Sequence, residues 1–203
     1  MRIAGIGGKK NLKEFKWEDF YKITKDRPPW PLLVQAVSLL SEGRDALDLG
    51  CGAGRDTRFL LEHGFRVTAV DTDPHAVALM LGFSQDRLRV VQSSFEAFDF
   101  ETYDLVNAQF ALPFLPEEQF HLVFVRIKQA LHTSGLFVGQ FFGVNDEWNT
   151  PGNQMTFLTK VQAESELKGL EILEFQEEDI DSHVADGTPK HWHVFHIIAK
   201  KLI

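Results

Sequence analysis

Three glycines at alternate positions follow a short apolar segment of this chain. The segment 46–49 runs into Gly50, and Gly52 and Gly54 come next, with Cys51 between the first two. Glycine allows positive φ angles and lets the backbone approach a ligand closely. When such a turn joins the first strand of a parallel sheet to a helix, it lies in the crevice where ligands usually bind. This turn is therefore the first candidate for a binding site.

Two aspartates accompany the glycine turn. Asp48 precedes it, and Asp71 ends a second apolar segment at about the distance expected of an acid that binds ribose hydroxyls. A carboxylate at position 48 is unfavourable beside a pyrophosphate but suits a cationic amino acid group. The dinucleotide fingerprint also requires a glycine where this chain has Arg55. The pattern favours a ligand with ammonium and sulfonium groups, and it disfavours the alternative of an NAD-linked oxidoreductase.

Strand-like and helix-like segments alternate along the chain. Strands are predicted at 45–49, 66–71, 88–92, 104–108, 135–142, 170–176 and 192–200, helices at 11–23, 31–40, 55–63, 75–82, 117–132 and 158–167, and loops at 143–157 and 179–191. This order predicts an α/β fold with a doubly wound, mostly parallel, Rossmann-like sheet of seven strands. No long helix separates the last two strands, so we expect a C-terminal hairpin to add an antiparallel edge strand.

The two glycine and aspartate motifs resemble those of the class I S-adenosylmethionine (SAM)-dependent methyltransferases. Residues 46–54 are similar to the first motif of that family, and residues 70–74 are similar to its second. The resemblance extends over about residues 45–142. The tail 190–200 is similar to the closing strand of small-molecule members related to tellurite-resistance and thiol methyltransferases. The resemblance implies that SAM is the cofactor.

The resemblance also implies roles for individual residues. The glycine turn would lie under the methionine part of SAM, Asp71 would bind the ribose, and Thr72 would lie beside the adenine. The family commonly has an acid after the third strand, where this chain has Ser94, so weaker adenine recognition is expected. The alternative is that Ser94 is a loop hydroxyl and Phe95 a core ring. The predicted cofactor-binding residues are Asp48, Gly50, Cys51, Gly52, Gly54, Asp71, Thr72, Ser94, Phe95 and Gln109.

The candidates for the acceptor side of the pocket are Arg27, Trp30, Phe110, His191 and His193. Trp30 would form an apolar wall, and Arg27 could meet an anionic group, with a solvated surface charge as its alternative. His191 or His193 could shuttle a proton, with a packed or strand-edge histidine as the alternative. Because side chains alternate along a strand, His196 would point away from these two histidines, and no metal site is expected.

Composition limits the class of protein. The 203 residues carry a formal net charge of -8, which disfavours nucleic acid as a partner. No segment approaches the roughly 20 apolar residues that span a bilayer, and no signal peptide is recognised, so a cytoplasmic protein is expected. The length fits a single domain, with residues 1–44 as a helical cap segment.

The sequence therefore predicts an enzyme that transfers a methyl group from SAM to a small-molecule acceptor, such as a thiol, a chalcogen oxyanion or a similar nucleophile. Acceptors that are already anionic need no general base, and no catalytic residue is assigned. Two alternatives stay open: a methyltransferase for a protein side chain or natural product, and a SAM-binding regulatory protein without turnover. The sequence leaves the oligomeric state undetermined.

Overall fold

The computed structural model describes residues 17–83 and 86–202. The helices are α1 (Trp17–Thr24), α2 (Pro31–Leu39), α3 (Arg55–Glu62), α4 (Pro74–Met80), α5 (Glu117–Ala130) and α6 (Lys160–Glu166), with a 3-10 turn η2 (Leu112–Phe114). The strands are β1 (Asp45–Leu49), β2 (Arg66–Asp71), β3 (Leu88–Gln92), β4 (Tyr103–Ala108), β5 (Leu131–Gly143), β6 (Phe157–Leu158), β7 (Leu170–His183) and β8 (Pro189–Lys201).

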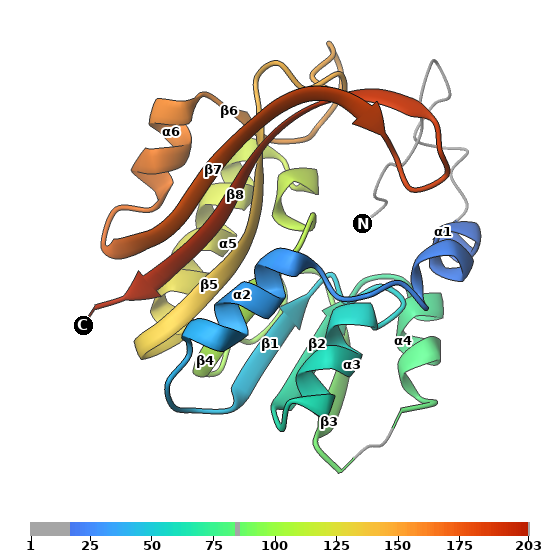
Figure 1. The fold of residues 1–203 in the computed structure, drawn as a ribbon, viewed down its shortest axis with the longest axis vertical. Helices are drawn as coiled ribbons and strands as arrows, with labels where there is room; N and C mark the ends of the chain where they lie inside the picture. The colour runs from blue at the N-terminus through green and yellow to red at the C-terminus, as the bar shows by residue number, and fades with distance from the viewer. Residues whose placement is uncertain (1–16, 84–85, 203) are drawn as a thin grey trace.

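The strands form one mixed sheet in the order β3-β2-β1-β4-β5-β8-β7, and the two-residue β6 pairs with β5 off this path. Neighbouring strands among β1 to β5 are parallel, whereas β8 lies between β5 and β7 and is antiparallel to both. Helices α2 and α3 lie on one face of the sheet, and α5 lies on the other (Figure 1). The predicted doubly wound sheet with a C-terminal hairpin at one edge is confirmed.

Phenylalanine rings fill the layer between α5 and the sheet. Phe120 and Phe124 lie one helical turn apart on α5 and meet Phe137 and Phe141 of β5 edge to face, with ring centroids 5.0 to 5.2 Å apart. All four rings are fully buried. Since side chains alternate along a strand, this packing directs Gln140 to the opposite face of β5. The aromatic core thus fixes which side chains β5 presents on the side of α2.

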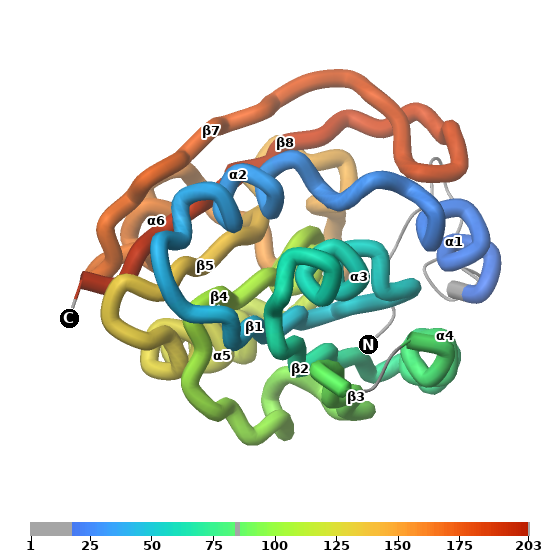
Figure 2. Tube along the Cα trace, turned by 60° about the horizontal axis from the view of Figure 1, so that its bottom comes forward, coloured from blue at the N-terminus to red at the C-terminus, as the bar shows by residue number. Residues whose placement is uncertain are grey.

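The predicted loop over residues 179–191 is wrong, because β7 continues to His183 and β8 begins at Pro189. Only residues 184–188 form the hairpin tip, which is closed by a hydrogen bond from Val184 N to Thr188 O of 2.8 Å. β7 is an edge strand with many exposed acidic side chains, so it lacks the apolar alternation that marks a half-buried strand. Figure 2 shows this hairpin arching over α2 towards α1.

Smaller departures concern the ends of helices. The predicted helix over 158–167 begins at Lys160, because Thr159 and Gln162 form a reciprocal capping box, and Phe157–Leu158 is the short strand β6. The predicted helix over 11–23 is described only from Trp17, and residues 11–16 lie outside the described part. None of the helices in the described part of the chain has the length and apolar character that a bilayer span requires.

The close contact between β4 and β5 at Gly139 leads to a first prediction. A Cβ atom at Gly139 would lie 2.8 Å from the backbone oxygen of Ala108 and 3.0 Å from the Phe137 ring. We expect Gly139→Ala to lower the free energy of unfolding by about 1–3 kcal/mol, since the two backbones must separate. Gly82→Ala is the control, because its Cβ would meet nothing closer than 3.5 Å. Urea unfolding measures both variants, and equal stability of the two would contradict the argument.

Candidate functional site

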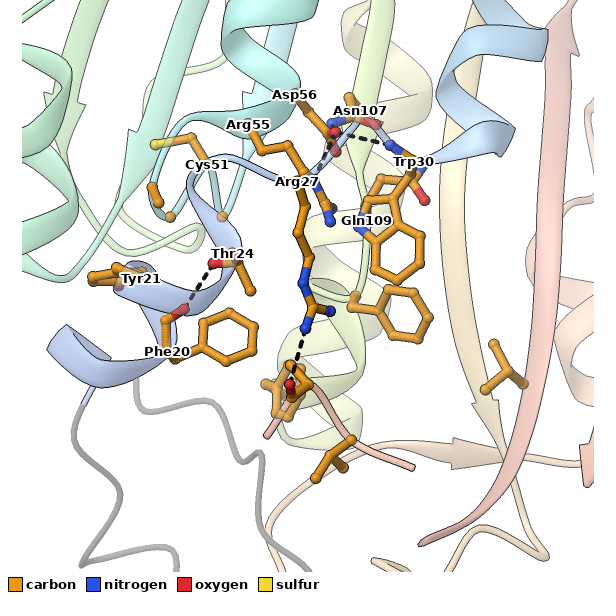
Figure 3. Close-up of a pocket in the computed structure, with 18 of the residues that line it drawn as sticks. Phe20, Tyr21, Thr24, Arg27, Trp30, Cys51, Arg55, Asp56, Asn107 and Gln109 are labelled. Atoms are coloured by element: carbon orange, nitrogen blue, oxygen red, sulfur yellow. Dashed lines mark hydrogen bonds and ion pairs between the residues drawn. The ribbon is translucent and has the colours of Figure 1, made fainter. Parts of the chain in front are cut away.

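A cavity of about 420 Å³ lies at the carboxyl ends of β1, β2 and β4 (Figure 3). Its walls come from the glycine turn, from α1 and the segment after it, from the residues that follow β4, and from the hairpin of β7 and β8. This volume is typical of small-molecule sites, and the position matches the crevice at which open α/β sheets bind ligands.

Six of the ten predicted cofactor residues line this cavity: Asp48, Gly50, Cys51, Gly52, Asp71 and Gln109. The other four, Gly54, Thr72, Ser94 and Phe95, lie outside its walls. Gly54 allows close packing, because a Cβ there would lie 2.0 Å from the terminal methyl group of Met80. The Ser94 hydroxyl accepts a hydrogen bond from the backbone of Ala97, and Phe95 is a core ring with 2% exposure.

Asp71 joins two turns at the floor of the cavity. Its carboxylate accepts hydrogen bonds of 2.9 Å from Gly52 N and from Asp73 N. Gly50 N in turn donates to Val70 O at 2.8 Å, so the glycine turn is bound to the end of β2. Burial raises the pKa of Asp71 above its usual value. Thr72 N also bonds to this carboxylate. A carboxylate has about four acceptor positions, so these backbone bonds still leave room for a ligand hydroxyl.

A buried junction of two carboxylates and an amide lies beside the glycine turn. Asn107 Nδ2 donates to Asp48 at 2.8 Å and to Asp56 at 3.4 Å, and the Thr57 hydroxyl donates to Asp48 at 2.5 Å. Asp56 also accepts from Trp30 N at 3.1 Å. Burial and the neighbouring Asp56 raise the pKa of Asp48 to about 7. The junction therefore connects β1, β4, α3 and the segment before α2.

The amide side chains of Gln109 and Gln140 form a relay with a defined direction. The backbone N–H of Phe110 donates to Gln140 Oε1 at 2.8 Å, so the other end of that amide must be its NH₂ group. Gln140 Nε2 donates to Gln109 Oε1 at 2.6 Å. Gln109 Nε2 is then left buried, without a hydrogen-bond partner among the described residues, beside the cavity. The relay therefore leaves an unsatisfied hydrogen-bond donor on a residue that lines the cavity.

Aromatic side chains form the part of the cavity beyond Gln109. Phe110 has a positive φ of 48°, which is rare for a bulky residue and indicates a conformation imposed by its surroundings. Its ring centroid lies 4.7 Å from that of Trp30, 5.8 Å from Trp192 and 6.2 Å from Phe142. Phe114 and Trp148 complete the group of rings at this end of the cavity. We call these six residues the aromatic compartment. Phe20 and Tyr21 of α1 also line the cavity.

Two predicted acceptor-side residues are placed elsewhere. His191 pairs with Asp179 at 2.7 Å and Asp181 at 2.8 Å, and His193 pairs with Glu177 at 3.1 Å; neither lines the cavity. The reason is the alternation of β8, which points Trp192, Val194 and His196 at the cavity instead. Among the described residues, no group of three or more candidate ligands could hold a metal ion.

The remaining acceptor-side candidates, Arg27, Trp30 and Phe110, line the cavity. Arg27 also donates a hydrogen bond of 2.9 Å to Ala185 O in the hairpin tip, so the segment before α2 is joined to that tip (Figure 3). Sequence reasoning missed other wall residues: Tyr21, Asp56, Trp192 and His196. The polar positions lack a motif that marks them, and the aromatic ones come together only in the folded chain.

Comparisons with known proteins agree with this geometry. A family of methyltransferase domains matches residues 46–135. Carboxy-S-adenosyl-L-methionine synthase of Ectopseudomonas mendocina is 30% identical over 135 residues, which cover 57% of this chain and 54% of that protein. The chain thus spans about half the length of the curated relatives that it matches.

Two solved structures share the fold. TehB of Haemophilus influenzae has a TM-score of 0.76 at 22% identity, covering 92% of this chain and 67% of TehB. The 1,6-didemethyltoxoflavin-N1-methyltransferase of Burkholderia thailandensis, with its heterocycle and S-adenosylhomocysteine bound, has a TM-score of 0.64 at 21% identity, covering 92% of this chain and 84% of that enzyme. Together with the matching domain family, they confirm the predicted resemblance to class I SAM-dependent methyltransferases.

The raised pKa of Asp48 gives a prediction for pH-dependent stability. The folded protein keeps this proton above the usual value of 3.8, up to about 7, so stability falls as the pH rises through that window. Asp48→Asn removes this contribution, which amounts to at most about 1.4 kcal/mol per pH unit for one proton. Urea unfolding at several pH values should give a flatter curve for Asp48→Asn than for wild type or for the exposed control Asp99→Asn. Parallel curves for all three would refute this assignment.

Proposed function

We propose that this chain, which carries a class I SAM-dependent methyltransferase domain, transfers the methyl group of SAM to a small-molecule acceptor. The observation that supports this most directly is a single cavity that extends from Asp71 and the glycine turn to the aromatic compartment. When bound, SAM supplies a methyl group activated by its sulfonium. The protein then has to align the reactants and exclude water.

The cavity walls fit the chemistry of SAM. Asp48, Asp56 and Asp71 give the cofactor side an acidic character, which suits a ligand with ammonium and sulfonium groups and opposes a pyrophosphate. Asn107 Oδ1 and Gln109 Nε2 are buried and lack hydrogen-bond partners among the described residues. Such groups are costly unless a ligand or water satisfies them. A ligand with both donor and acceptor groups would satisfy them.

We assign roles to the residues that would hold SAM. Asp71 binds the ribose hydroxyls, and the Asp48 side of the glycine turn faces the methionine part. Tyr21 of α1 covers the turn, since a Cβ at Gly52 would lie 3.4 Å from its ring. Arg55 stacks on Trp30, with its guanidinium 4.4 Å from the ring centroid, and lines the same cavity. In this proposal, α1 and the segment before α2 exclude water from the reacting groups.

The acceptor class rests on the site and on similar proteins. The aromatic compartment suits a small molecule, and the enzyme of Burkholderia thailandensis is named for a heterocyclic acceptor. The relative from Ectopseudomonas mendocina is named for the synthesis of a carboxylated SAM, which gives a second candidate function. Mass spectrometry separates them: methyl transfer yields S-adenosylhomocysteine and a methylated acceptor, whereas the second yields a heavier SAM derivative. A regulatory protein would consume no SAM.

The glycine turn provides one test of SAM binding. Gly52 has a φ of 51° and lines the cavity, so Gly52→Val places a branched side chain in the ligand's space. We expect calorimetry to show no SAM binding, with a native circular dichroism spectrum. Gly169→Val is the matched control, because Gly169 also has a positive φ of 89° but lies in open space after α6. Normal SAM affinity of Gly52→Val would exclude this turn as the site.

Asp71 provides a second test. Asp71→Ala removes an acceptor that faces the proposed ribose position, and we expect it to weaken SAM binding by about 1.5–3 kcal/mol. The bond to Gly52 N is also lost, so thermal unfolding of the ligand-free variant should be followed in parallel. Asp99→Ala, which changes an exposed carboxylate that does not line the cavity, is a suitable control. An unchanged SAM dissociation constant for Asp71→Ala would contradict the assignment.

A further inference from the structure

His196 is the half-buried histidine that faces the cavity from β8. No hydrogen bond joins either of its ring nitrogens to a residue in ranges 17–83 or 86–202, whereas His191 and His193 are both paired with carboxylates. A half-buried imidazole with an open hydrogen-bonding position beside a cavity is available to a ligand.

The position of His196 places it on the acceptor side. It pairs across the sheet with Gln140, whose amide holds both Phe110 N and Gln109 Oε1. Its ring centroid lies 6.5 Å from that of Phe110 in an edge-on arrangement. Gln109, Phe110 and His196 all line the cavity, so the His196 ring lies where the residues after β4 meet the aromatic compartment. A ligand with a polar atom beside Phe110 would meet this imidazole as a base.

The aromatic compartment favours a neutral ring over a cation. The ammonium of Lys190 is fully buried, 3.6 Å from the centroid of Trp192 and 4.3 Å from that of Trp148. Asp146 holds it with bonds of 2.6 and 2.7 Å. Because this internal cation already interacts with the π-systems of both indoles, a quaternary ammonium ligand would find them less favourable than in an open aromatic cage. Flat, uncharged rings can still stack against these walls.

We propose that the acceptor is a neutral, flat aromatic compound with an ionisable O–H or N–H group, and that His196 is the general base that takes its proton. This inference rests on the proposed methyl transfer and specifies the acceptor of the same site. It differs from the sequence-based expectation of an acceptor that is already anionic, which would need no base.

The proposed step balances as follows. The acceptor's O–H or N–H bond breaks, and its proton forms a bond to the His196 nitrogen that faces the cavity. The electron pair freed on the acceptor atom forms the bond to the methyl carbon. The pair of the carbon–sulfur bond stays on sulfur, which leaves as the neutral thioether of S-adenosylhomocysteine. His196 ends as imidazolium and returns its proton to solvent.

The surroundings of His196 are compatible with this role. Burial lowers its pKa, so the ring is neutral at neutral pH and can accept a proton, while Glu178 on β7 acts in the opposite direction. The other ionisable residues on the cavity walls are Tyr21, Arg27, Asp48, Cys51, Arg55, Asp56, Asp71 and His183. Gln176 and Gln140, its neighbours on β7 and β5, carry no charge.

The test uses the full chain with two matched probes, 1-naphthol, which is neutral at pH 7, and 1-naphthalenethiol, which ionises more readily. Binding is followed by quenching of tryptophan fluorescence in the presence of S-adenosylhomocysteine, since Trp30, Trp148 and Trp192 line the cavity. Methylation is followed as S-adenosylhomocysteine formed from SAM between about pH 5 and 9. The variants are His196→Gln and the control His63→Gln, which changes an exposed histidine at the end of α3.

We expect His196→Gln to lower kcat for 1-naphthol about 100-fold or more, as for loss of a general base, with KM little changed. Its rate should recover as rising pH ionises the naphthol, and its rate with 1-naphthalenethiol should change less than about threefold. SAM affinity by calorimetry should stay unchanged. In wild type, the rate with 1-naphthol should fall as acid protonates His196, a readout that needs no variant.

Other outcomes overturn different parts. If His196→Gln keeps the wild-type kcat and pH profile with 1-naphthol, His196 is not the base. The same conclusion follows if the variant loses kcat equally with both probes. Methylation of 1-naphthalenethiol alone also overturns the role of His196 as base. So does binding of both probes without methylation of 1-naphthol. If SAM binds but neither probe quenches the tryptophan fluorescence, the proposal of an aromatic acceptor is overturned. The proposal of methyl transfer is not affected by that result. Absence of SAM binding to wild type overturns the proposed function itself.

Discussion

The site depends on a single buried amide, the side chain of Asn107, which lies between two carboxylates. Its nitrogen donates to Asp48 at 2.8 Å and to Asp56 at 3.4 Å, at a place with almost no exposure to solvent. Two acids so close together and so deeply buried would repel each other and lose hydration, and hydrogen bonds offset only part of that cost. The raised pKa of Asp48 reflects this conflict. Through Asp56 the junction also holds Trp30 N, so the floor and one wall of the cavity share one set of bonds.

A second set of bonds determines the polarity of the opposite wall. An amide side chain can be rotated so that its oxygen and nitrogen exchange places, but a backbone N–H can only donate. Phe110 N therefore fixes Gln140, and Gln140 fixes Gln109. Phe110 itself has a positive φ of 48°, and its ring lines the cavity. Phe110 thus orients the amides of Gln140 and Gln109 through its backbone N–H, and it also contributes its own ring to the aromatic compartment.

Sequence reasoning succeeded where the determinants are local. The alternation of strands and helices gave the fold. A strand, a glycine turn and the start of a helix within ten residues located Gly50 and Gly52 at the crevice, and the acid at the end of the next strand located Asp71 there. It failed where the determinants are distant. The face of β8 that meets the cavity depends on its register with β5, so His191 and His193 were chosen although His196 lines the cavity. Ser94 and Phe95 follow β3, but packing turns Phe95 into the core below Gly50. The residues of the aromatic compartment come from five separate segments, which only the folded chain brings together.

The two halves of the cavity differ in charge, and this difference accords with a single reaction. The cofactor side carries three acids, Asp48, Asp56 and Asp71, against one cation, Arg55, which pairs with Asp56. The walls beyond Gln109 are rings backed by the buried Lys190–Asp146 pair. A cationic ligand is therefore stabilised on the first side and a neutral one on the second, so the two reactants of the proposed reaction are not expected to compete for one subsite. Transfer of a methyl group removes the positive charge of the sulfonium. The acidic side then loses part of its attraction for the product, which favours exchange for a new cofactor molecule without any movement of the fold.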